Sequence, residues 1–209
     1  MINKKRSSII CSMLLRLIIL LIIVLLLPLF LFLSLLILFF SGWPIFFVQK
    51  RIGKDGEVFE MYKFRTMRVG AEKEKKKYLE LNEVDGPVFK IINDPRFTKI
   101  GKFLAHTGLD ELPQLYNVLG GEMAIVGPRP LPVKEESQIA EKYRYIRRTV
   151  LPGIISNWVL DGYHGMNFEN WMRQDMRYIE NRSFAGDLVL LIRSVGLFIR
   201  LLAKETVRN

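Results

Sequence analysis

One long uncharged stretch restricts what this chain can fold into more than any other feature. Residues 17–40 read LIILLIIVLLLPLFLFLSLLILFF, and only Pro28 and Ser34 interrupt the apolar side chains. A straight helix of this length would reach about 36 Å, more than the roughly 30 Å hydrocarbon core of a bilayer. A cleavable signal peptide fits poorly, because the apolar run is too long and no clear small-residue cleavage site follows it. We therefore predict a membrane-embedded segment over residues 1–43.

Basic residues flank this segment on both sides: Lys4, Lys5, Arg6 and Arg16 before it, and Lys50, Arg51 and Lys54 after it. The positive-inside tendency draws both ends toward the cytoplasm. Pro28 lies near the middle, where it removes a backbone hydrogen bond and clashes with the preceding turn, so the helix should kink there. We predict a re-entrant helix hairpin with both ends on the cytoplasmic face. The alternative is a single crossing with a tolerated proline kink.

The charge of the chain indicates the kind of partner. The formal net charge of +10 implies an anionic partner, which could be nucleic acid, an acidic membrane surface or a phosphorylated substrate. No nucleic-acid reader motif is recognisable, so we expect no nucleic acid. Cys11 is the only cysteine, which excludes an internal disulfide and CxxC metal or redox motifs.

Residues 44–209 read as one α+β domain, a small mixed α/β cytoplasmic unit whose size allows a real core. Strands are expected at residues 45–49 and 58–64, on either side of the turn-rich GKDG. Further along we expect a short helix over 109–119, a strand and proline-stiffened loop over 122–132, and a charged helix over 134–148.

A second apolar pattern lies near the C-terminus. In DLVLLIRSVGLFIRLLAK, helical periodicity places apolar side chains on one face and charged ones largely opposite. The apolar face holds Leu188, Leu191, Ile192, Val195, Phe198, Ile199 and Leu202, and the charged residues are Asp187, Arg193, Arg200 and Lys204. Such a helix either lies in the bilayer interface or packs against the domain core.

Two adjacent carboxylates, Asp110 and Glu111, stand in the stretch TGLDELPQL. The ordinary interpretation is a helix start, where an acidic cap and a following Pro113 are both common. Beside fixed cations, however, the same pair could bind a divalent metal or accept a phosphoryl group as a nucleophile.

Three long motifs and the hydrophobic N-terminus together resemble the monotopic phosphoglycosyl transferases, a group of bacterial sugar transferases. The motifs are KFRTM at 63–67, GPVFKIINDPRFTKIGKFL at 86–104 and LDELPQLYNVLGGEMAIVGPRP at 109–130. The resemblance covers nearly the whole chain up to Gly153 and is looser in the C-terminal third. It implies a catalytic sugar transferase domain over 44–209, at the cytoplasmic face of the bacterial inner membrane.

The resemblance also implies a reaction. Such enzymes use an Asp-Glu dyad and Mg²⁺ to move a phosphosugar from a UDP-sugar to polyprenyl (undecaprenyl) phosphate in the membrane lipid. Asp110 would attack the sugar-side phosphate and release UMP, and Glu111 would help position the metal and the nucleophile. The candidates for holding phosphates or the nucleotide are Lys63, Arg65, Arg96 and Arg129, for which surface salt bridges are the alternative role.

The chain departs from the family pattern at several positions. Ala105 and His106 stand where the family commonly has arginines, and LPGIISNWVLDGYHG at 151–165 lacks the usual leading arginine. Leu27 precedes Pro28, where the family often has serine. We expect structural or surface roles for His106 and His164. Two alternatives remain: a non-catalytic membrane-anchored binder of nucleotide sugar or polyprenyl phosphate, and a membrane-tethered nucleic-acid-binding protein.

Overall fold

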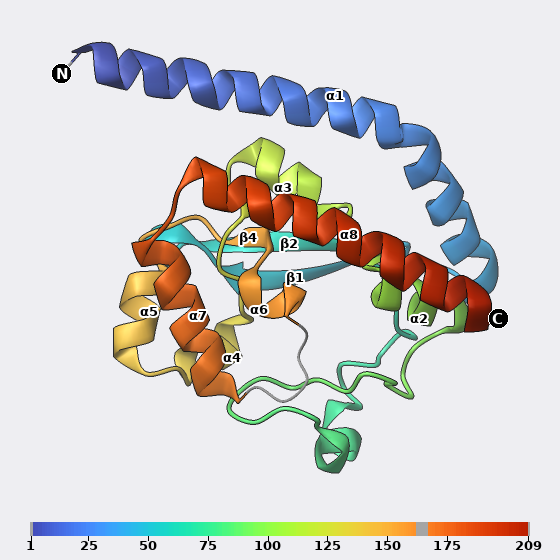
Figure 1. Ribbon diagram of the computed structural model, residues 1–209. Helices are drawn as coiled ribbons and strands as arrows, with labels where there is room; N and C mark the ends of the chain where they lie inside the picture. The colour runs from blue at the N-terminus through green and yellow to red at the C-terminus, as the bar shows by residue number, and fades with distance from the viewer. Residues whose placement is uncertain (1, 162–166, 209) are drawn as a thin grey trace.

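The computed structural model describes residues 2–161 and 167–208, with side chains described for 13–161 and 167–205. Helices and strands mix along the chain, which confirms the α+β prediction in its general form (Figure 1). The larger elements are α1 (Ile2–Ser41), β1 (Phe46–Ile52), β2 (Val58–Phe64), α2 (Lys99–Thr107), α3 (Gln114–Gly120), β3 (Ala124–Val126), α4 (Val133–Ser137), α5 (Glu141–Arg147), β4 (Gly153–Ile155), α6 (Asn157–Leu160), α7 (Phe168–Glu180) and α8 (Phe184–Arg208). Three 3₁₀ turns complete them: η1 (Lys54–Gly56), η2 (Lys75–Leu81) and η3 (Leu109–Glu111).

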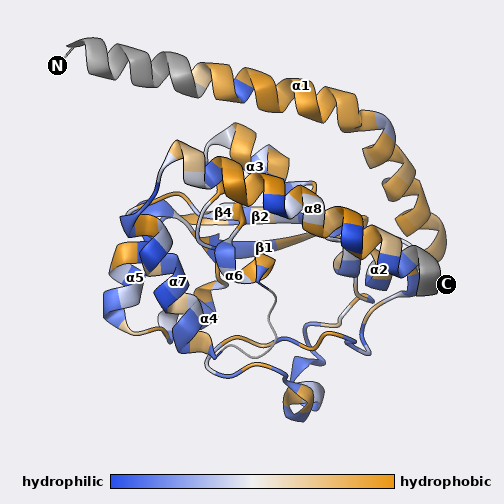
Figure 2. Cartoon of the chain, viewed as in Figure 1, coloured by the Kyte–Doolittle hydropathy of each residue, from blue (hydrophilic) through white to orange (hydrophobic). Residues whose placement is uncertain are grey.

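The predicted membrane segment is a single long helix, α1, with Pro28 inside it. Its part Met13–Ser41 contains an 18-residue window with a mean hydropathy of 3.3 and is long and apolar enough to cross a membrane. Figure 1 shows that the axis of α1 bends in its second half, the half that contains Pro28. Figure 2 shows that this helix is hydrophobic on its outward side as well as on the side toward the domain. The helix therefore has the composition of a segment surrounded by lipid.

Strands β1 and β2 form the predicted antiparallel hairpin, with Phe46 opposite Phe64 and Ile52 opposite Val58. The first strand extends three residues beyond its predicted end at residue 49. The turn passes through Asp55 and Gly56, which both have positive φ values of 56° and 82°. This left-handed conformation is the one for which glycine and aspartate are best suited, which explains the turn sequence KDG.

A second, two-stranded parallel sheet pairs β3 with β4. Gly127, the residue after β3, lies very close to Gly153, the first residue of β4. A Cβ atom on Gly153 would lie 2.0 Å from the backbone nitrogen of Gly127. Only glycine fits such an approach. The contact fixes the loop that leaves β3, and this loop carries Arg129.

Two predicted helices are interrupted. The helix expected over 109–119 is divided into η3 and α3, because Pro113 has no N–H and begins the second piece. The charged helix expected over 134–148 is divided into α4 and α5, since the Ser137 hydroxyl donates to the Lys134 carbonyl and the chain then turns Ile139 into the core.

Helix α1 packs against the domain through two hydrophobic clusters. In one, Ile19 lies among Phe59, Met61, Val118 and Met123. In the other, Leu33 and Ile37 lie among Phe64 and Leu104. A third cluster, without α1, surrounds the stacked rings of Trp158 and Trp171, whose centroids are 4.7 Å apart. The domain core is therefore built in part from the membrane helix.

Helix α8 contacts α2, α6, β3 and β4, and lies below α1 in the view of Figure 1. Its inward stripe consists of Leu190, Ser194, Leu197 and Leu201. Most of the predicted apolar face is exposed instead, with exposed fractions of 64% for Ile192 and 60% for Ile199. The helix thus packs on the domain with one stripe and keeps a second apolar stripe at the surface.

Candidate active site

The carboxylates Asp110 and Glu111 lie in the 3₁₀ turn η3, directly after α2 ends at Gly108 with a left-handed φ of 79°. Leu109 and Leu112, on either side of the pair, pack into the cluster that holds Leu33 and Ile37 of α1. Within the described residues, neither η3 nor α3 begins with a side-chain cap. The helix-cap role considered for Asp110 is therefore not what the structure shows.

Two cations hold Glu111. The Lys63 ammonium lies 2.6 Å from Glu111 Oε1 and 3.6 Å from Asp110 Oδ2. Arg129 donates from Nη1 to Glu111 Oε2 at 3.3 Å, and from Nη2 to Oε1. Both oxygens of Glu111 are thus engaged, whereas Asp110 contacts Lys63 at a longer distance. The printed contacts therefore hold Glu111 more firmly than Asp110.

The pKa values of the two carboxyls diverge. Burial raises the pKa of Asp110 to about 6, with Lys63 opposing the shift and Glu111 adding to it. Burial acts in the same direction on Glu111, but Arg129 and Lys63 outweigh it and hold the pKa of that carboxyl well below its usual range. Two adjacent carboxyls with pKa values pushed apart are typical of catalytic pairs with separate roles.

The loop after β3 presents Arg129 between Pro128 and Pro130, and two further arginines hold its backbone. Arg147 Nη2 donates to the Arg129 carbonyl at 2.6 Å. Arg51 Nη1 donates to the Pro130 carbonyl at 2.9 Å. Because both contacts are to backbone oxygens, they fix the loop whatever the side chain at position 129.

Arg147 is itself buried and forms an ion pair with the buried Asp175. The other oxygen of Asp175 accepts a hydrogen bond from Trp158 Nε1 at 3.1 Å. The position of Arg129 is therefore tied to the Trp158 and Trp171 cluster. Sequence reasoning missed Arg51 and Arg147, because their partners lie 79 and 18 residues away in the chain.

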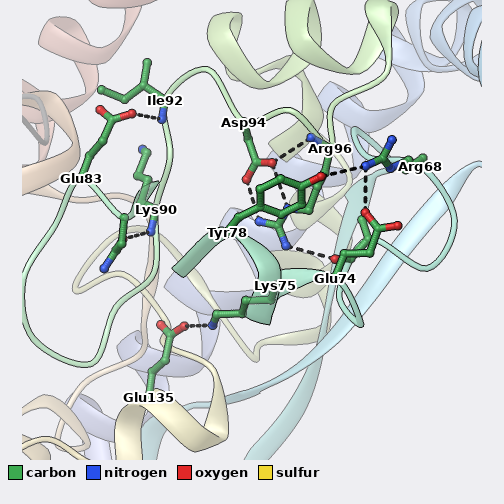
Figure 3. A network of polar contacts seen from close by, with 12 residues as sticks. Arg68, Glu74, Lys75, Tyr78, Glu83, Lys90, Ile92, Asp94, Arg96 and Glu135 are labelled. Carbon is green, nitrogen blue, oxygen red and sulfur yellow. Dashed lines mark hydrogen bonds and ion pairs between the residues drawn. The ribbon is translucent and has the colours of Figure 1, made fainter. Parts of the chain in front are cut away.

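The other two predicted substrate-binding cations have different partners. Arg65 donates to the carbonyls of Ser41 at 2.6 Å and of Pro44 at 2.5 Å, at the end of α1. Arg96 makes two bonds to Asp94, at 2.9 and 2.6 Å (Figure 3). The structure thus brings Lys63 and Arg129 to the dyad, and ties Arg65 to the membrane helix and Arg96 to its own loop.

The charges of the dyad also act on Lys90, a residue that sequence reasoning did not single out. Burial lowers its pKa to about 6, Arg129 adds to the decrease and Glu111 opposes it. The signal that could have identified it is its place in the motif GPVFK, two residues after the buried Val88.

His106 lies 3.0 Å from Glu205 of α8 and 3.0 Å from the Ile92 carbonyl. It therefore links α2, α8 and a loop, in a structural position. His164 lies outside the described residues.

Among the described residues, no group of three or more histidine, cysteine, aspartate or glutamate side chains gathers where it could hold a metal ion. Mg²⁺ is often held by one or two carboxylates together with substrate phosphates. Asp110 and Glu111 fit that second mode, in which the substrate completes the coordination.

Residues 7–200 match the sequence model described as "Bacterial sugar transferase". The chain is 40% identical over 163 residues to the galactosyl transferase CpsE of Streptococcus agalactiae, covering 76% of this chain and 35% of CpsE. It is 33% identical over 172 residues to the exopolysaccharide production protein ExoY of Rhizobium meliloti, covering 80% of this chain and 76% of ExoY.

A relative from Klebsiella pneumoniae is named UDP-glucose:undecaprenyl-phosphate glucose-1-phosphate transferase. It is 34% identical over 175 residues, covering 80% of this chain and 35% of the relative. The chain thus spans about a third of the length of this relative and of CpsE. The family match extends well past Gly153, and it confirms the resemblance that the motifs indicated. The chain belongs to the bacterial sugar transferase family.

Proposed function

We propose that this protein transfers a phosphosugar from a UDP-sugar to undecaprenyl phosphate, with release of UMP, as a first step of glycoconjugate assembly. The observation that carries the proposal is the asymmetric dyad: Lys63 and Arg129 both bond to Glu111, and Asp110 beside it is buried with a raised pKa. The name of the Klebsiella pneumoniae relative supports the same reaction class.

The reaction proceeds in two displacements at one phosphorus atom. A carboxylate oxygen of Asp110 forms a bond to the sugar-side phosphorus, and the bond from that phosphorus to the bridging oxygen breaks. The electron pair leaves with UMP, and a phosphosugar remains covalently bound to Asp110. An oxygen of undecaprenyl phosphate then attacks the same phosphorus, and the carboxylate of Asp110 is released.

Glu111 holds Lys63 and Arg129 in place, so that positive charge surrounds the reacting phosphorus. Asp110 and Glu111 are the residues that would hold Mg²⁺. When bound, the ion supplies charge screening between the diphosphate and the carboxylate.

The position of the dyad supports a lipid acceptor. Leu109 and Leu112 pack against the cluster to which α1 contributes Leu33 and Ile37, so the carboxylates stand beside residues that join the helix of membrane composition to the domain. At the end of this helix, Phe39, Phe40 and Trp43 are strongly exposed. Aromatic side chains are enriched at the level of lipid headgroups, where the phosphate of the acceptor would be found. The exposed stripe of α8 would lie in the same interface.

A UMP exchange assay tests the proposed function. The full chain in detergent is incubated with Mg²⁺, a panel of UDP-sugars and labelled UMP, without undecaprenyl phosphate. Because the first displacement is reversible, label should enter one or more UDP-sugars. Binding of UDP-sugars without exchange or UMP release would identify the non-catalytic binder instead. Salt-sensitive binding of DNA or RNA without turnover would favour the nucleic-acid alternative.

Cysteine labelling tests the proposed re-entrant topology. In a Cys11→Ser background, Ser8→Cys and Lys54→Cys should both react with a membrane-impermeant maleimide from the cytoplasmic side, since both flanks are basic. Labelling from opposite sides would refute the re-entrant arrangement. Adding Pro28→Ala restores a backbone hydrogen bond and should shift part of the population toward a straight crossing.

A further inference from the structure

A phenylalanine of β1, Phe47, lies next to the cation that contacts both carboxylates of the dyad. In the register of the hairpin, Phe47 stands directly opposite Lys63, so the two side chains are on the same face of the sheet. The Lys63 ammonium lies 2.6 Å from Glu111 Oε1 and 3.6 Å from Asp110 Oδ2. Strand pairing therefore places an aromatic ring on the face from which Lys63 reaches Asp110 and Glu111.

The face of the hairpin that carries Phe47 is open at this position. Phe47 is 38% exposed, whereas Met61, two residues before Lys63 on the same face, is only 2% exposed. An exposed aromatic ring favours apolar contact, because covering it removes apolar surface from water. A molecule that contacts Lys63 at the open end of this face can therefore also cover the ring of Phe47.

Exposed aromatic residues continue from Phe47 toward the membrane helix. The residue before it, Phe46, is exposed, and so are Trp43 and the last aromatic residues of α1, Phe39 and Phe40. All of them lie in the stretch that runs from the end of α1 into the start of β1. An aromatic-rich segment thus leads from the helix of membrane composition to the residue opposite Lys63.

Beyond Phe47, the same face of β1 becomes polar. Gln49 and Arg51 follow at alternate positions, and Arg51 Nη2 donates to Gln49 Oε1 at 2.6 Å. Arg51 Nη1 donates to the carbonyl of Pro130, the residue after Arg129, at 2.9 Å. Phe47 therefore lies at the boundary between the aromatic segment that begins at α1 and the polar groups around Arg129.

We propose that Phe47 contacts the first isoprene units of the polyprenyl phosphate acceptor and thereby contributes to acceptor binding. The inference rests on the proposed function, because it takes that lipid as the acceptor. The phosphate of the acceptor has to reach the phosphorus held by Asp110 while the isoprenoid tail stays in the bilayer. A cation next to exposed aromatic side chains matches both ends of such a molecule, because Lys63 attracts the phosphate and Phe47 covers the first apolar carbons. The uracil of the donor needs hydrogen-bond partners, so it fits the polar end of this face better, where Gln49 and Arg51 lie.

Steady-state kinetics that vary the two substrates separately test the inference. The full chain in detergent with Mg²⁺ is compared with Phe47→Ala and with Val48→Ala. Val48 is the next residue of β1, is 42% exposed and has its side chain on the opposite face, so its variant is the matched control. Phe47→Ala should raise the KM for undecaprenyl phosphate by about tenfold, and the KM for the UDP-sugar by less than about threefold. Val48→Ala should leave both KM values within about twofold of the parent, and Phe47→Leu, which keeps an apolar side chain, should recover most of the acceptor affinity.

An unchanged KM for undecaprenyl phosphate in Phe47→Ala would overturn the inference. A larger rise in the KM for the UDP-sugar than in that for the acceptor would also overturn it, and would indicate that the ring stacks on uracil. An equal effect in Val48→Ala would do the same, because exposed apolar surface in general would then account for both. Should Phe47→Ala not fold, Phe47→Thr takes its place under the same criteria.

Calorimetric titration with farnesyl phosphate, a short polyprenyl phosphate, separates this inference from the proposed function, because it requires no turnover. A parent that binds farnesyl phosphate but releases no UMP from any UDP-sugar refutes the proposed reaction. In that case a Kd about tenfold higher in Phe47→Ala than in the parent would still support the contact with the isoprenoid, and an equal Kd would overturn it. A parent that neither binds farnesyl phosphate nor releases UMP refutes both.

Discussion

Replacing Asp110 with Asn is expected to lower UMP release and UMP exchange by about 10³-fold or more, because an amide cannot act as the nucleophile. The change nearly preserves shape, so the packing of Leu109 and Leu112 against the cluster of Leu33 and Ile37 should persist. Initial rates with a UDP-sugar and Mg²⁺ provide the measurement. Chelating Mg²⁺ should stop the same exchange in the parent, since the charge of the diphosphate would then repel the carboxylate.

The same variant should be at least as stable as the parent at neutral pH. The pKa of Asp110 is raised to about 6 in the folded protein, so folding favours the protonated form. Its contribution to stability is therefore complete below the unfolded pKa and is lost as pH rises through about 6. At neutral pH the buried Asp110 carboxylate is ionised at a cost in folding free energy. A neutral Asn removes this cost, which is of the order of 1–3 kcal/mol at about 1.4 kcal/mol per pKa unit.

Thermal unfolding in EDTA checks this expectation, and Glu111→Gln is the matched control. The pKa of Glu111 is lowered, so its contribution to stability is present above the unfolded pKa and is lost as pH falls. Glu111→Gln should therefore destabilise the protein at neutral pH, opposite in sign to Asp110→Asn. If Asp110→Asn unfolds the protein or retains activity, Asp110 is not the nucleophile, and Glu111 becomes the next candidate.

Replacing Arg129 with Lys is expected to reduce kcat/KM by about 10²-fold while the fold stays intact. Arg129 contacts both oxygens of Glu111, and a lysine keeps the charge but cannot reproduce the two-point contact. The loop itself should persist, because Arg147 and Arg51 hold backbone carbonyls and not the Arg129 side chain. The unfolding temperature should remain within about 2 °C of the parent.

Arg96→Lys provides the control for Arg129→Lys, because Arg96 also makes a two-point contact with a carboxylate, that of Asp94. Burial alone would raise the pKa of Asp94, but hydrogen bonds from Arg96 outweigh it and lower that pKa. Arg96→Lys should thus lower the unfolding temperature more than Arg129→Lys does. An Arg129→Lys variant as active as the parent would show that only bulk positive charge matters at this position.

Features written in a local run of sequence could be predicted. The uncharged stretch predicted α1, and two short strand-like runs on either side of the turn-rich GKDG predicted the hairpin of β1 and β2. The adjacent carboxylates and GPRP predicted Asp110, Glu111 and Arg129, which the structure brings together with Lys63. Each of these patterns is formed by residues that are neighbours in the chain, so it can be recognised in a single sequence.

Features that depend on distant packing could not be predicted. Arg65 shares the motif KFRTM with Lys63, and Arg96 lies in another basic motif. Only the fold decides which guanidinium meets a backbone carbonyl and which cation meets Glu111. On α8, leucines occupy so many positions that periodicity could not identify Leu190 and Leu197 as the inward residues. Lys90 was overlooked because its loop has no regular pattern, and its charged neighbours come from three separate segments.

The shared cluster between α1 and the domain limits how this protein can be engineered into a water-soluble form. Leu33 and Ile37 are almost fully buried, and losing a buried aliphatic side chain costs about 2–5 kcal/mol. A chain that starts after Ser41 would lose both and would leave Arg65 short of a carbonyl acceptor. Deletion of α1 would therefore remove part of the hydrophobic core of the domain, and not only a membrane anchor. Solubilisation should instead replace outward residues such as Leu25 and Phe39 with polar ones, which leaves the inward side of the helix in place.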